Sequence, residues 1–244
     1  MNKDNSQKTF QRIEQKYLLS EEQYTALMER LQEHIRPDEF CKSTICSIYY
    51  DTPDYRLIRA SIDKPVYKEK LRLRSYGIPS QNNTVFVEIK KKYSGVVYKR
   101  RVPMTLTEAE RYLSHNIHPV RESQILHEID WFKQFYEGLQ PVMFLSYDRE
   151  AYVDQENPDL RLTFDTNIRW RQKRLRLEDG IGGEELLEKG QYLMELKIPG
   201  ALPIWLVRLM EELEIQQSSY SKYGAAYQNY LAVKIAAKGG LVCA

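Results

Sequence analysis

Basic side chains alternate with apolar ones along one stretch of this sequence. From residue 68 to residue 74, every second position is basic, namely Lys68, Lys70, Arg72 and Arg74. Successive side chains of a β-strand point to opposite faces, so these four cations would share one face. Arginine offers paired donors to phosphate oxygens and lysine offers a mobile point charge. The pattern therefore suits a ligand that carries several phosphates in series.

This concentration of positive charge is local. The 244-residue chain has 36 Lys and Arg against 34 Asp and Glu, a formal net charge of +2. Between Lys64 and Arg101, eleven basic residues stand against two acidic ones, which gives this segment a net charge of +9. The overall charge thus does not indicate a nucleic-acid or membrane binder, and any electrostatic function must depend on how the charges are arranged.

Other predicted strands also place ionic or hydroxyl-bearing side chains two positions apart. The pairs are Glu14 with Lys16, Glu88 with Lys90, Lys99 with Arg101, Tyr147 with Arg149, Arg161 with Thr163 and Asp165, and Glu195 with Lys197. A solvated outer face of an antiparallel sheet would show the same alternation. Like charges about 7 Å apart on a strand, however, repel by roughly 2.4 kcal/mol at an effective dielectric of 20. A face of cations in a confined space therefore favours a site that receives an anion.

Hydrophobic periodicity predicts an α+β fold. Strands are expected at residues 10–19, 47–51, 67–76, 84–91, 96–103, 142–153, 160–170, 171–177 and 191–198. A capping box at Ser20 and Gln23 predicts a helix whose apolar face reaches Ile35, and a second box is expected at Thr107 and Glu110. Further helices are predicted at residues 123–136, from Pro203 onward, and at residues 222–238.

Two arrangements of these elements would bring the charges together. An open sheet could lie against a polyanion, or the sheet could close into an antiparallel β-barrel, a tunnel with a charged interior. Each predicted helix has one apolar stripe that could cover the outside of such a barrel. We therefore expect a single tunnel domain over residues 1–244, flanked by helices.

The carboxylates of these strands are candidate ligands for a divalent metal. Glu14, Glu88, Asp165 and Glu195 lie among the cations, and Mg²⁺ or Mn²⁺ would bridge carboxylate and phosphate oxygens. The alternative for each carboxylate is an internal salt bridge. No run of apolar residues is long enough to span a membrane, and no secretory leader is visible, so the expected location is the cytoplasm.

At these residues the sequence resembles the VTC domain, the polyphosphate polymerase domain of the triphosphate tunnel metalloenzyme, or CYTH-like, superfamily. The resemblance covers nearly the whole chain. Its motifs, in order, are Lys16-Tyr17, Arg72-x-Arg74, Glu88-x-Lys90, Lys99-x-Arg101, Tyr147-x-Arg149, Arg161, Glu195-x-Lys197 and Ser221-Lys222.

The resemblance implies a divalent-metal-dependent enzyme that moves the γ-phosphate of ATP onto a growing polyphosphate chain. The implied catalytic residues are Arg72, Arg74, Lys90 and Glu195. The implied phosphate-binding residues are Lys16, Arg72, Arg74, Lys90, Lys99, Tyr147, Arg149, Arg161, Lys197, Ser221 and Lys222. Glu195 would hold Mn²⁺ or Mg²⁺, with Glu14 and Glu88 as further candidates. The implied partners are ATP with polyphosphate or pyrophosphate, and not nucleic acid.

Two other functions fit the same residues. A hydrolase of the superfamily would split tripolyphosphate or a nucleoside triphosphate with water, using the same cationic cage. A non-catalytic protein would bind polyphosphate or another polyanion without turnover. Eukaryotic members of the family join this domain to a phosphate-sensing SPX domain and to membrane helices, which this sequence lacks. Coupling to transport would then need a membrane partner protein.

Overall fold

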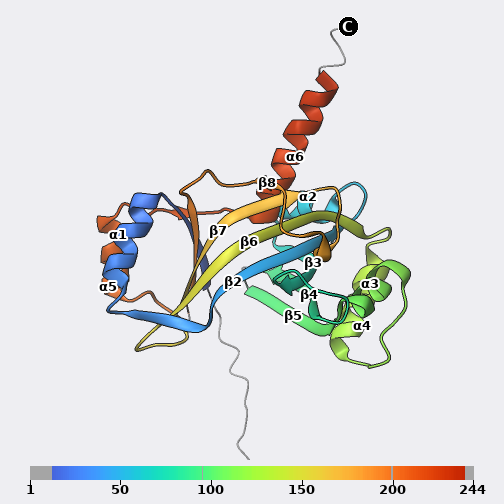
Figure 1. The fold of residues 1–244 in the computed structure, drawn as a ribbon, viewed down its shortest axis with the longest axis horizontal. Coiled ribbons are helices and arrows are strands. Elements are labelled where there is room, and N and C mark those ends of the chain that lie inside the picture. Colours follow the sequence, from blue (N-terminus) through green and yellow to red (C-terminus); the bar gives the residue numbers. More distant parts are fainter. Residues whose placement is uncertain (1–12, 95, 199, 240–244) are drawn as a thin grey trace, which may run out of the picture.

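The computed structural model describes residues 13–94, 96–198 and 200–239. Ten strands in this part of the chain form one antiparallel sheet (Figure 1). The strands are β1 (Ile13–Leu19), β2 (Ile35–Asp51), β3 (Tyr67–Tyr76), β4 (Thr84–Tyr93), β5 (Val96–Thr105), β6 (Gln140–Asp154), β7 (Arg161–Arg171), β8 (Glu184–Glu185), β9 (Tyr192–Ile198) and β10 (Gln217–Ser218). The α-helices are α1 (Glu21–Leu31), α2 (Arg56–Ile62), α3 (Leu106–His115), α4 (Gln124–Phe135), α5 (Ile204–Glu212) and α6 (Lys222–Gly239).

The sheet runs in the order β10-β1-β9-β7-β6-β2-β3-β4-β5, and β8 pairs with β7. Hydrogen bonds between the described strands do not close this path into a ring. The sheet nevertheless curves strongly. Glu14 of β1 and Lys90 of β4 lie 3.5 Å apart through their side chains, although five strands separate β1 from β4 in the sheet order. The predicted α+β fold, a tunnel-like antiparallel sheet flanked by helices, is confirmed.

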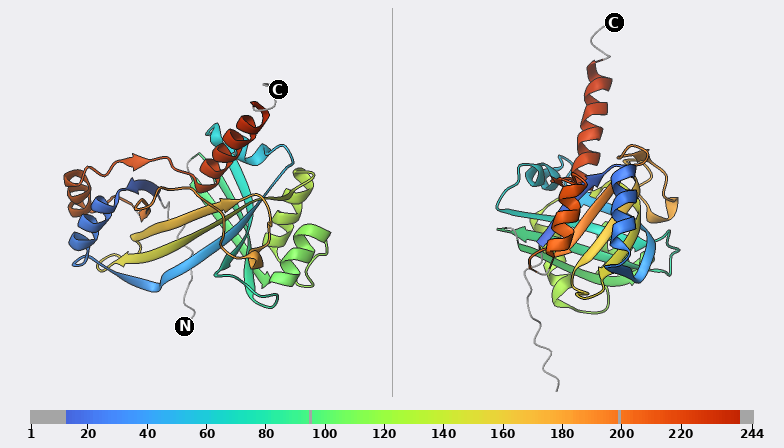
Figure 2. Two further views of the ribbon diagram at one scale, coloured as in Figure 1. Left: turned by 45° about the horizontal axis from the view of Figure 1, so that its top comes forward. Right: turned by 90° about the vertical axis from the view of Figure 1, so that its left-hand side faces the viewer.

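Helices cover the outer face of the sheet in two separate places (Figure 2). Helices α3 and α4 pack on β3, β4 and β5, where Leu71, Val87 and Ile89 are buried in one apolar cluster. Helices α1 and α5 cover β1, β7 and β9, where Leu162 and Leu196 belong to a second cluster. Because side chains alternate along each strand, burial of these residues turns their charged neighbours to the inner face.

Helix α6 begins against the inner face and then leaves the body of the protein (Figure 1). Its first turns pack Tyr223 and Tyr227 in a cluster with Tyr49, Met143 and Trp170 of the sheet. Asp51, which is fully buried, accepts hydrogen bonds from the Tyr223 hydroxyl at 2.9 Å and from backbone N–H groups of α2. Among the described helices, none is both long and apolar enough to cross a membrane.

Most predicted strands and helices are present, and the capping box of Ser20 and Gln23 is confirmed. The helix it opens ends at Leu31 rather than near Ile35, because Ile35 begins β2 and pairs with Asp154 of β6. The second capping box uses Thr105 and Glu108, so the prediction of Thr107 and Glu110 was two residues late. The strand predicted to start at residue 10 is described from Ile13, and residues 10–12 lie outside the described residues.

The prediction of a strand at residues 171–177 was wrong. The Arg171 guanidinium donates to the carbonyl oxygens of Arg174, Arg176, Gly180 and Gly182, and so folds this segment into a loop. A 3₁₀ turn, Leu177–Asp179, follows the loop. The short elements α2, β8 and β10 were not predicted, because they are too short to show a hydrophobic period.

Candidate functional site

The inner face of β3, β4 and β5 carries most of the cations. The register places Arg72, Glu88 and Arg101 in one row across the three strands, Lys70, Lys90 and Lys99 in the next, and Lys68 beside Lys92 in a third. We call this surface the basic wall; its residues are Lys68, Lys70, Arg72, Arg74, Glu88, Lys90, Lys92, Lys99 and Arg101. The basic wall therefore contains eight cations and one carboxylate.

Glu88 is the carboxylate of the basic wall with which three of its cations pair, and it is only 1% exposed. Its carboxylate lies 2.6 Å from Arg72 Nε, 3.0 Å from Lys99 Nζ and 3.7 Å from Arg74 Nε. Burial raises the pKa of Glu88, but the charges of Arg72, Arg74 and Lys99 outweigh it and lower the pKa to about 2. Glu88 thus stays ionised and orients three cations toward one point.

A second inner surface faces the basic wall. It is formed by β1, β9, β7 and β6 together with the first residue of α6. We call it the paired wall; its residues are Glu14, Lys16, Arg149, Arg161, Asp165, Glu195, Lys197 and Lys222. Five cations there accompany three carboxylates, and Glu14 connects the two walls through its contact with Lys90.

Glu195 and Asp165 form a buried ion-pair network in the paired wall. Glu195 lies 2.9 Å from Lys222 Nζ, 3.0 Å from Arg149 Nη2 and 3.2 Å from Lys16 Nζ. Asp165 accepts from Arg149 at 2.6 and 2.7 Å and lies 2.5 Å from Lys222 Nζ. These contacts fix Arg149 and Lys222 in single positions, which is the order that a preorganised charge site needs.

The network shifts the pKa of its members in opposite directions. Burial raises the pKa of Glu195, but Lys222, Lys16 and Arg149 together hold it well below its ordinary value. Burial lowers the pKa of Lys222, but Asp165 and Glu195 outweigh this effect, so its pKa lies above the ordinary value. Both groups therefore remain charged across the physiological range.

Three lysines of the inner face have pKa values below the ordinary value of lysine. Burial, reinforced by neighbouring lysines, lowers the pKa of Lys70 to about 8, and burial with Arg74 and Arg72 nearby lowers that of Lys99 to about 8 even though Glu88 opposes it. Burial and Arg149 likewise lower the pKa of Lys197. The Lys70 ammonium group lies 5.6 Å from the centre of the Tyr223 ring. Such groups gain most from an incoming anion.

Two tyrosine hydroxyls complete the inner face. Tyr147 accepts a hydrogen bond from Arg74 Nη2 at 3.3 Å, and its ring lies 4.5 Å from Lys222 Nζ. Tyr49 accepts from Arg72 Nη1 at 3.3 Å. Burial raises the pKa of Tyr49, but Arg72, Lys70 and Arg74 together lower it to about 8. The strong positive potential of the inner face is the cause of the Tyr49 shift.

The structure brings most of the predicted site residues together. Lys16, Arg72, Arg74, Lys90, Lys99, Tyr147, Arg149, Lys197 and Lys222 share the inner face with Glu14, Glu88 and Glu195. The other two predicted residues have partners of their own. Arg161 lies opposite Lys197 in the paired wall, and its guanidinium pairs with Asp38 of β2. The Ser221 hydroxyl accepts from the backbone N–H of Gly224 at the start of α6.

Sequence reasoning did not single out Tyr49 of the inner face. Lys70 and Asp165, which the period-two pattern had placed on the charged face and among the candidate metal ligands, also lie there. Tyr49 was hidden because its partner Arg72 lies on the neighbouring strand, and the register between strands is not visible in one sequence.

A metal ion would need ligands beyond the protein. Among the described residues, no three His, Cys, Asp or Glu side chains gather as a metal site. Glu14 and Glu195 are nevertheless close enough for Lys16 Nζ to bridge them, at 3.8 and 3.2 Å. Mg²⁺ commonly binds through one or two carboxylates together with substrate phosphates and water. This pair of carboxylates therefore fits a divalent ion that arrives with a phosphate ligand.

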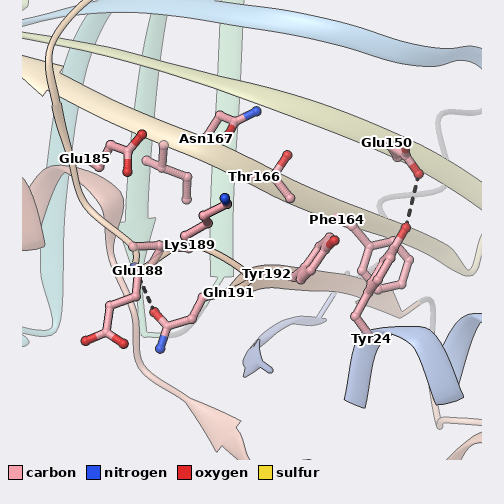
Figure 3. Close-up of a pocket in the computed structure, with 13 residues that line it drawn as sticks. Tyr24, Glu150, Phe164, Thr166, Asn167, Glu185, Glu188, Lys189, Gln191 and Tyr192 are labelled. Atoms are coloured by element: carbon pink, nitrogen blue, oxygen red, sulfur yellow. Dashed lines mark hydrogen bonds between the residues drawn. The ribbon is translucent and has the colours of Figure 1, made fainter. Parts of the chain in front are cut away.

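A cavity of about 410 Å³ lies elsewhere, on the outer face between α1, β7 and the segment before β9 (Figure 3). Tyr24 and Tyr192 stack at 3.8 Å on one side of it. Glu150, Glu185 and Glu188 line it with Lys189 as the only cation among its lining residues. This negative balance disfavours phosphate, which separates the cavity from the cationic inner face.

Comparison with known proteins agrees with this architecture. The family model of the VTC domain matches residues 11–231. A search of the curated proteins finds no match. A candidate adenylate cyclase from Bacillus halodurans shares 17% identity at a TM-score of 0.54, over 86% of this chain and 95% of that one. A candidate adenylyl cyclase from Hippeastrum, described as having a dominant triphosphatase activity, shares 16% identity at a TM-score of 0.53, over 89% and 95%. These two likenesses concern the fold.

Proposed function

The chain belongs to the VTC domain family, and from that premise we propose that it transfers the γ-phosphate of ATP to a polyphosphate chain inside its cationic tunnel. The observation that carries the proposal is the convergence of Arg72, Arg74 and Lys99 on one inner surface, opposite Lys16, Arg149 and Lys222. A triphosphate between these groups would be contacted from two sides.

Phosphoryl transfer asks mainly for alignment and positive charge, which these residues can supply. The attacking and leaving oxygens must lie roughly in line with the transferred phosphorus, and cations must stabilise its equatorial oxygens. Arg72 and Arg74 are the arginines nearest to Glu88, and their guanidinium groups can each bind two phosphate oxygens. In this proposal they hold the γ-phosphate while ADP leaves.

The attacking group is the terminal oxygen of orthophosphate, pyrophosphate or a polyphosphate chain. Because that oxygen is already ionised, the reaction needs no general base. A new P–O bond to the chain end forms as the bond between the β,γ-bridging oxygen and the γ-phosphorus breaks, and ADP carries away the electron pair. Glu195 and Glu14 would hold a divalent ion, which would neutralise charge on the phosphate oxygens.

The same cage could serve hydrolysis if water occupied the attacking position, as a triphosphatase requires. Incubation of the purified protein with ATP and Mn²⁺, followed by separation of the products by length, distinguishes the two. Chains of increasing length with release of ADP support the transferase. Orthophosphate alone supports the hydrolase, and tight binding of polyphosphate without turnover supports a binding protein.

The roles proposed for the site can be tested with Glu195→Gln. This variant removes one charge and keeps the side-chain shape, so Lys16, Arg149 and Lys222 lose the carboxylate that aligns them. We expect turnover to fall at least about a hundredfold, comparable to the loss of one preorganised electrostatic group. A variant that folds and makes chains at the native rate would show that Glu195 does not have this role.

A further inference from the structure

The cavity on the outer face has the size of a small-molecule site and takes no part in the proposed reaction. Its volume is about 410 Å³, within the range of ligand pockets. Its lining comes from α1, β6, β7, β8 and the segment before β9 (Figure 3). Asn167, which lines it, lies at an irregularity of the β6–β7 ladder and has a φ of 49°. Such a bulge interrupts the ladder and redirects side chains.

Aromatic rings form one side of this cavity. Tyr24 and Tyr192 stack face to face, with ring centres 3.8 Å apart and 5° between their planes. Phe164 meets Tyr24 edge-on at 5.2 Å. The Tyr24 hydroxyl donates to Glu150 at 3.3 Å, which holds this ring in place. The face of an aromatic ring attracts an ammonium group, and methylene groups pack against it equally well.

Carboxylates lie at two ends of the cavity. Glu150 is opposite Phe164 in the β6–β7 ladder, and Glu185 is opposite Arg169 in the β7–β8 ladder. The five residues from Phe164 to Arg169 correspond to about 16 Å along β7. Figure 3 shows Glu150 on the aromatic side, with Glu185 and Glu188 on the other. A ligand that contacts both ends must be extended and must carry positive charge at each end.

The cations already beside these carboxylates can be replaced by a ligand. Lys42 lies 2.9 Å from Glu150, and the Lys42 side chain is 75% exposed. Arg169 lies 3.3 Å from Glu185, whose side chain is 55% exposed. Exposed ion pairs of this kind contribute little to stability, so an incoming ammonium group can exchange for them. The lining itself contains three carboxylates and one cation, Lys189, so its charge favours a cationic ligand.

We propose that this cavity binds a linear polyamine. One ammonium group lies at Glu150, another lies at Glu185 and Glu188, and the methylene chain between them packs along Tyr192. A metal ion is too compact to contact both ends, and among the described residues no three carboxylate, His or Cys side chains gather as a metal site. The inference is independent of the proposed function, because no lining residue belongs to either inner wall.

The test measures the affinity of spermidine for the wild type and for Glu185→Gln with Glu188→Gln. Calorimetry is carried out without phosphate or divalent metal. The control is Glu29→Gln with Glu211→Gln, which removes the same charge from exposed positions of α1 and α5 outside the cavity. Putrescine, a shorter diamine, is compared on the wild type. Thermal unfolding shows that each variant is folded.

A polyamine site requires a selective loss. For the Glu185 and Glu188 variant we expect spermidine affinity to fall about tenfold, because two charged contacts are removed. The control should stay within about twofold of the wild type. Lys189→Gln should bind spermidine about threefold more tightly, because it removes the only cation of the lining. Putrescine should bind the wild type about tenfold more weakly than spermidine, because it cannot reach both ends.

Other outcomes overturn the inference in distinguishable ways. If spermidine does not bind the wild type, the cavity is not a polyamine site. If the control loses as much affinity as the Glu185 and Glu188 variant, spermidine is attracted by overall negative charge and not by the cavity. If putrescine binds as tightly as spermidine, the contact with two ends is wrong. If tetralysine binds more tightly than spermidine and depends on the same glutamates, the cavity serves a basic protein segment.

Discussion

The two inner walls are built from the same residue types but differ in their ratio of cations to carboxylates. In the paired wall, Asp165, Glu195 and Glu14 accompany five cations, and buried contacts near 3 Å fix Arg149 and Lys222. The basic wall holds eight cations but one carboxylate of its own, Glu88, which pairs with Arg72, Arg74 and Lys99. The paired wall is therefore largely neutralised by its own fold, whereas the basic wall depends on an anion from outside.

This difference indicates where a phosphate ligand gains its affinity. Phosphate near the paired wall must compete with carboxylates that already hold the cations. Phosphate near the basic wall relieves repulsion among Lys70, Lys90 and Lys99 and raises their affinity for protons. We therefore expect the basic wall to contribute most of the affinity for phosphate. The paired wall should mainly orient the bound phosphate and bind the metal.

The largest expected effect is the loss of an arginine from the basic wall. Arg74→Ala removes a guanidinium group that contacts both Glu88 and Tyr147, and turnover should fall about a hundredfold or more. Rates are measured together with thermal unfolding. The control is Arg100→Ala, because Arg100 points to the outer face and pairs with Glu128 at 3.0 Å. Equal activity of Arg74→Ala and the control would contradict the assigned role.

Glu88→Gln tests how the single carboxylate of the basic wall affects stability and phosphate binding. In the ligand-free protein, removing the only carboxylate leaves Arg72, Arg74 and Lys99 without their partner, and we expect a loss of about 3 kcal/mol in the free energy of unfolding. Tripolyphosphate should bind this variant more tightly than the wild type, because Glu88 no longer competes for the cations. Urea denaturation with and without tripolyphosphate measures both effects.

One result would contradict the idea that Glu88 competes with phosphate for the cations of the basic wall. If Glu88→Gln is destabilised but tripolyphosphate binds it more weakly than the wild type, Glu88 assists the ligand instead of competing with it. Measurement without divalent metal keeps any metal-binding role of Glu88 out of the comparison.

The lowered pKa values of Lys70 and Lys99, each about 8, predict a pH dependence of binding. A bound phosphate stabilises the protonated lysines, so binding takes up protons, and affinity is greatest below pH 8 and falls as pH rises through it. We expect a loss of about tenfold for each lysine between about pH 7 and pH 9. Calorimetry in buffers of different ionisation enthalpy measures the proton uptake, and pH-independent affinity over this range would contradict it.

A smaller effect is expected from Tyr147→Phe. The change removes the hydroxyl that accepts from Arg74 but keeps the ring beside Lys222. One hydrogen bond to a charged group at this distance contributes about 1 kcal/mol, so the specificity constant for ATP should fall roughly fivefold. A loss as large as that of Arg74→Ala would assign the hydroxyl to the reaction itself.

Much of the fold was predictable because the strands alternate so regularly. Basic residues occupy every second position from Lys68 to Arg74, and β3, Tyr67–Tyr76, contains all four of them. Side chains that share a face of one strand, such as Arg72 and Arg74, could be assigned without a structure. The motif order of the VTC domain added the expectation that separate strands converge.

What the sequence did not show depends on contacts between distant segments. Asp38 of β2 pairs with Arg161 of β7 across β6, which lies between the two strands, and Asp38 falls in the irregular part of β2 between Pro37 and Lys42. Lys222 reaches Asp165 because Tyr223 is anchored to Asp51, a residue 172 positions away. The local sequence pattern after Arg171 predicts a strand. The segment is a loop instead, because the Arg171 guanidinium group donates hydrogen bonds to four of its carbonyl oxygens.

The account depends most directly on where a short phosphate chain binds. A crystal structure of the protein soaked with tripolyphosphate tests this in one measurement. We predict phosphate density on the inner face within hydrogen-bond distance of Arg72, Arg74 and Lys99. Density confined to the outer surface, with the Glu88 ion pairs unchanged and no phosphate on the inner face, would contradict it.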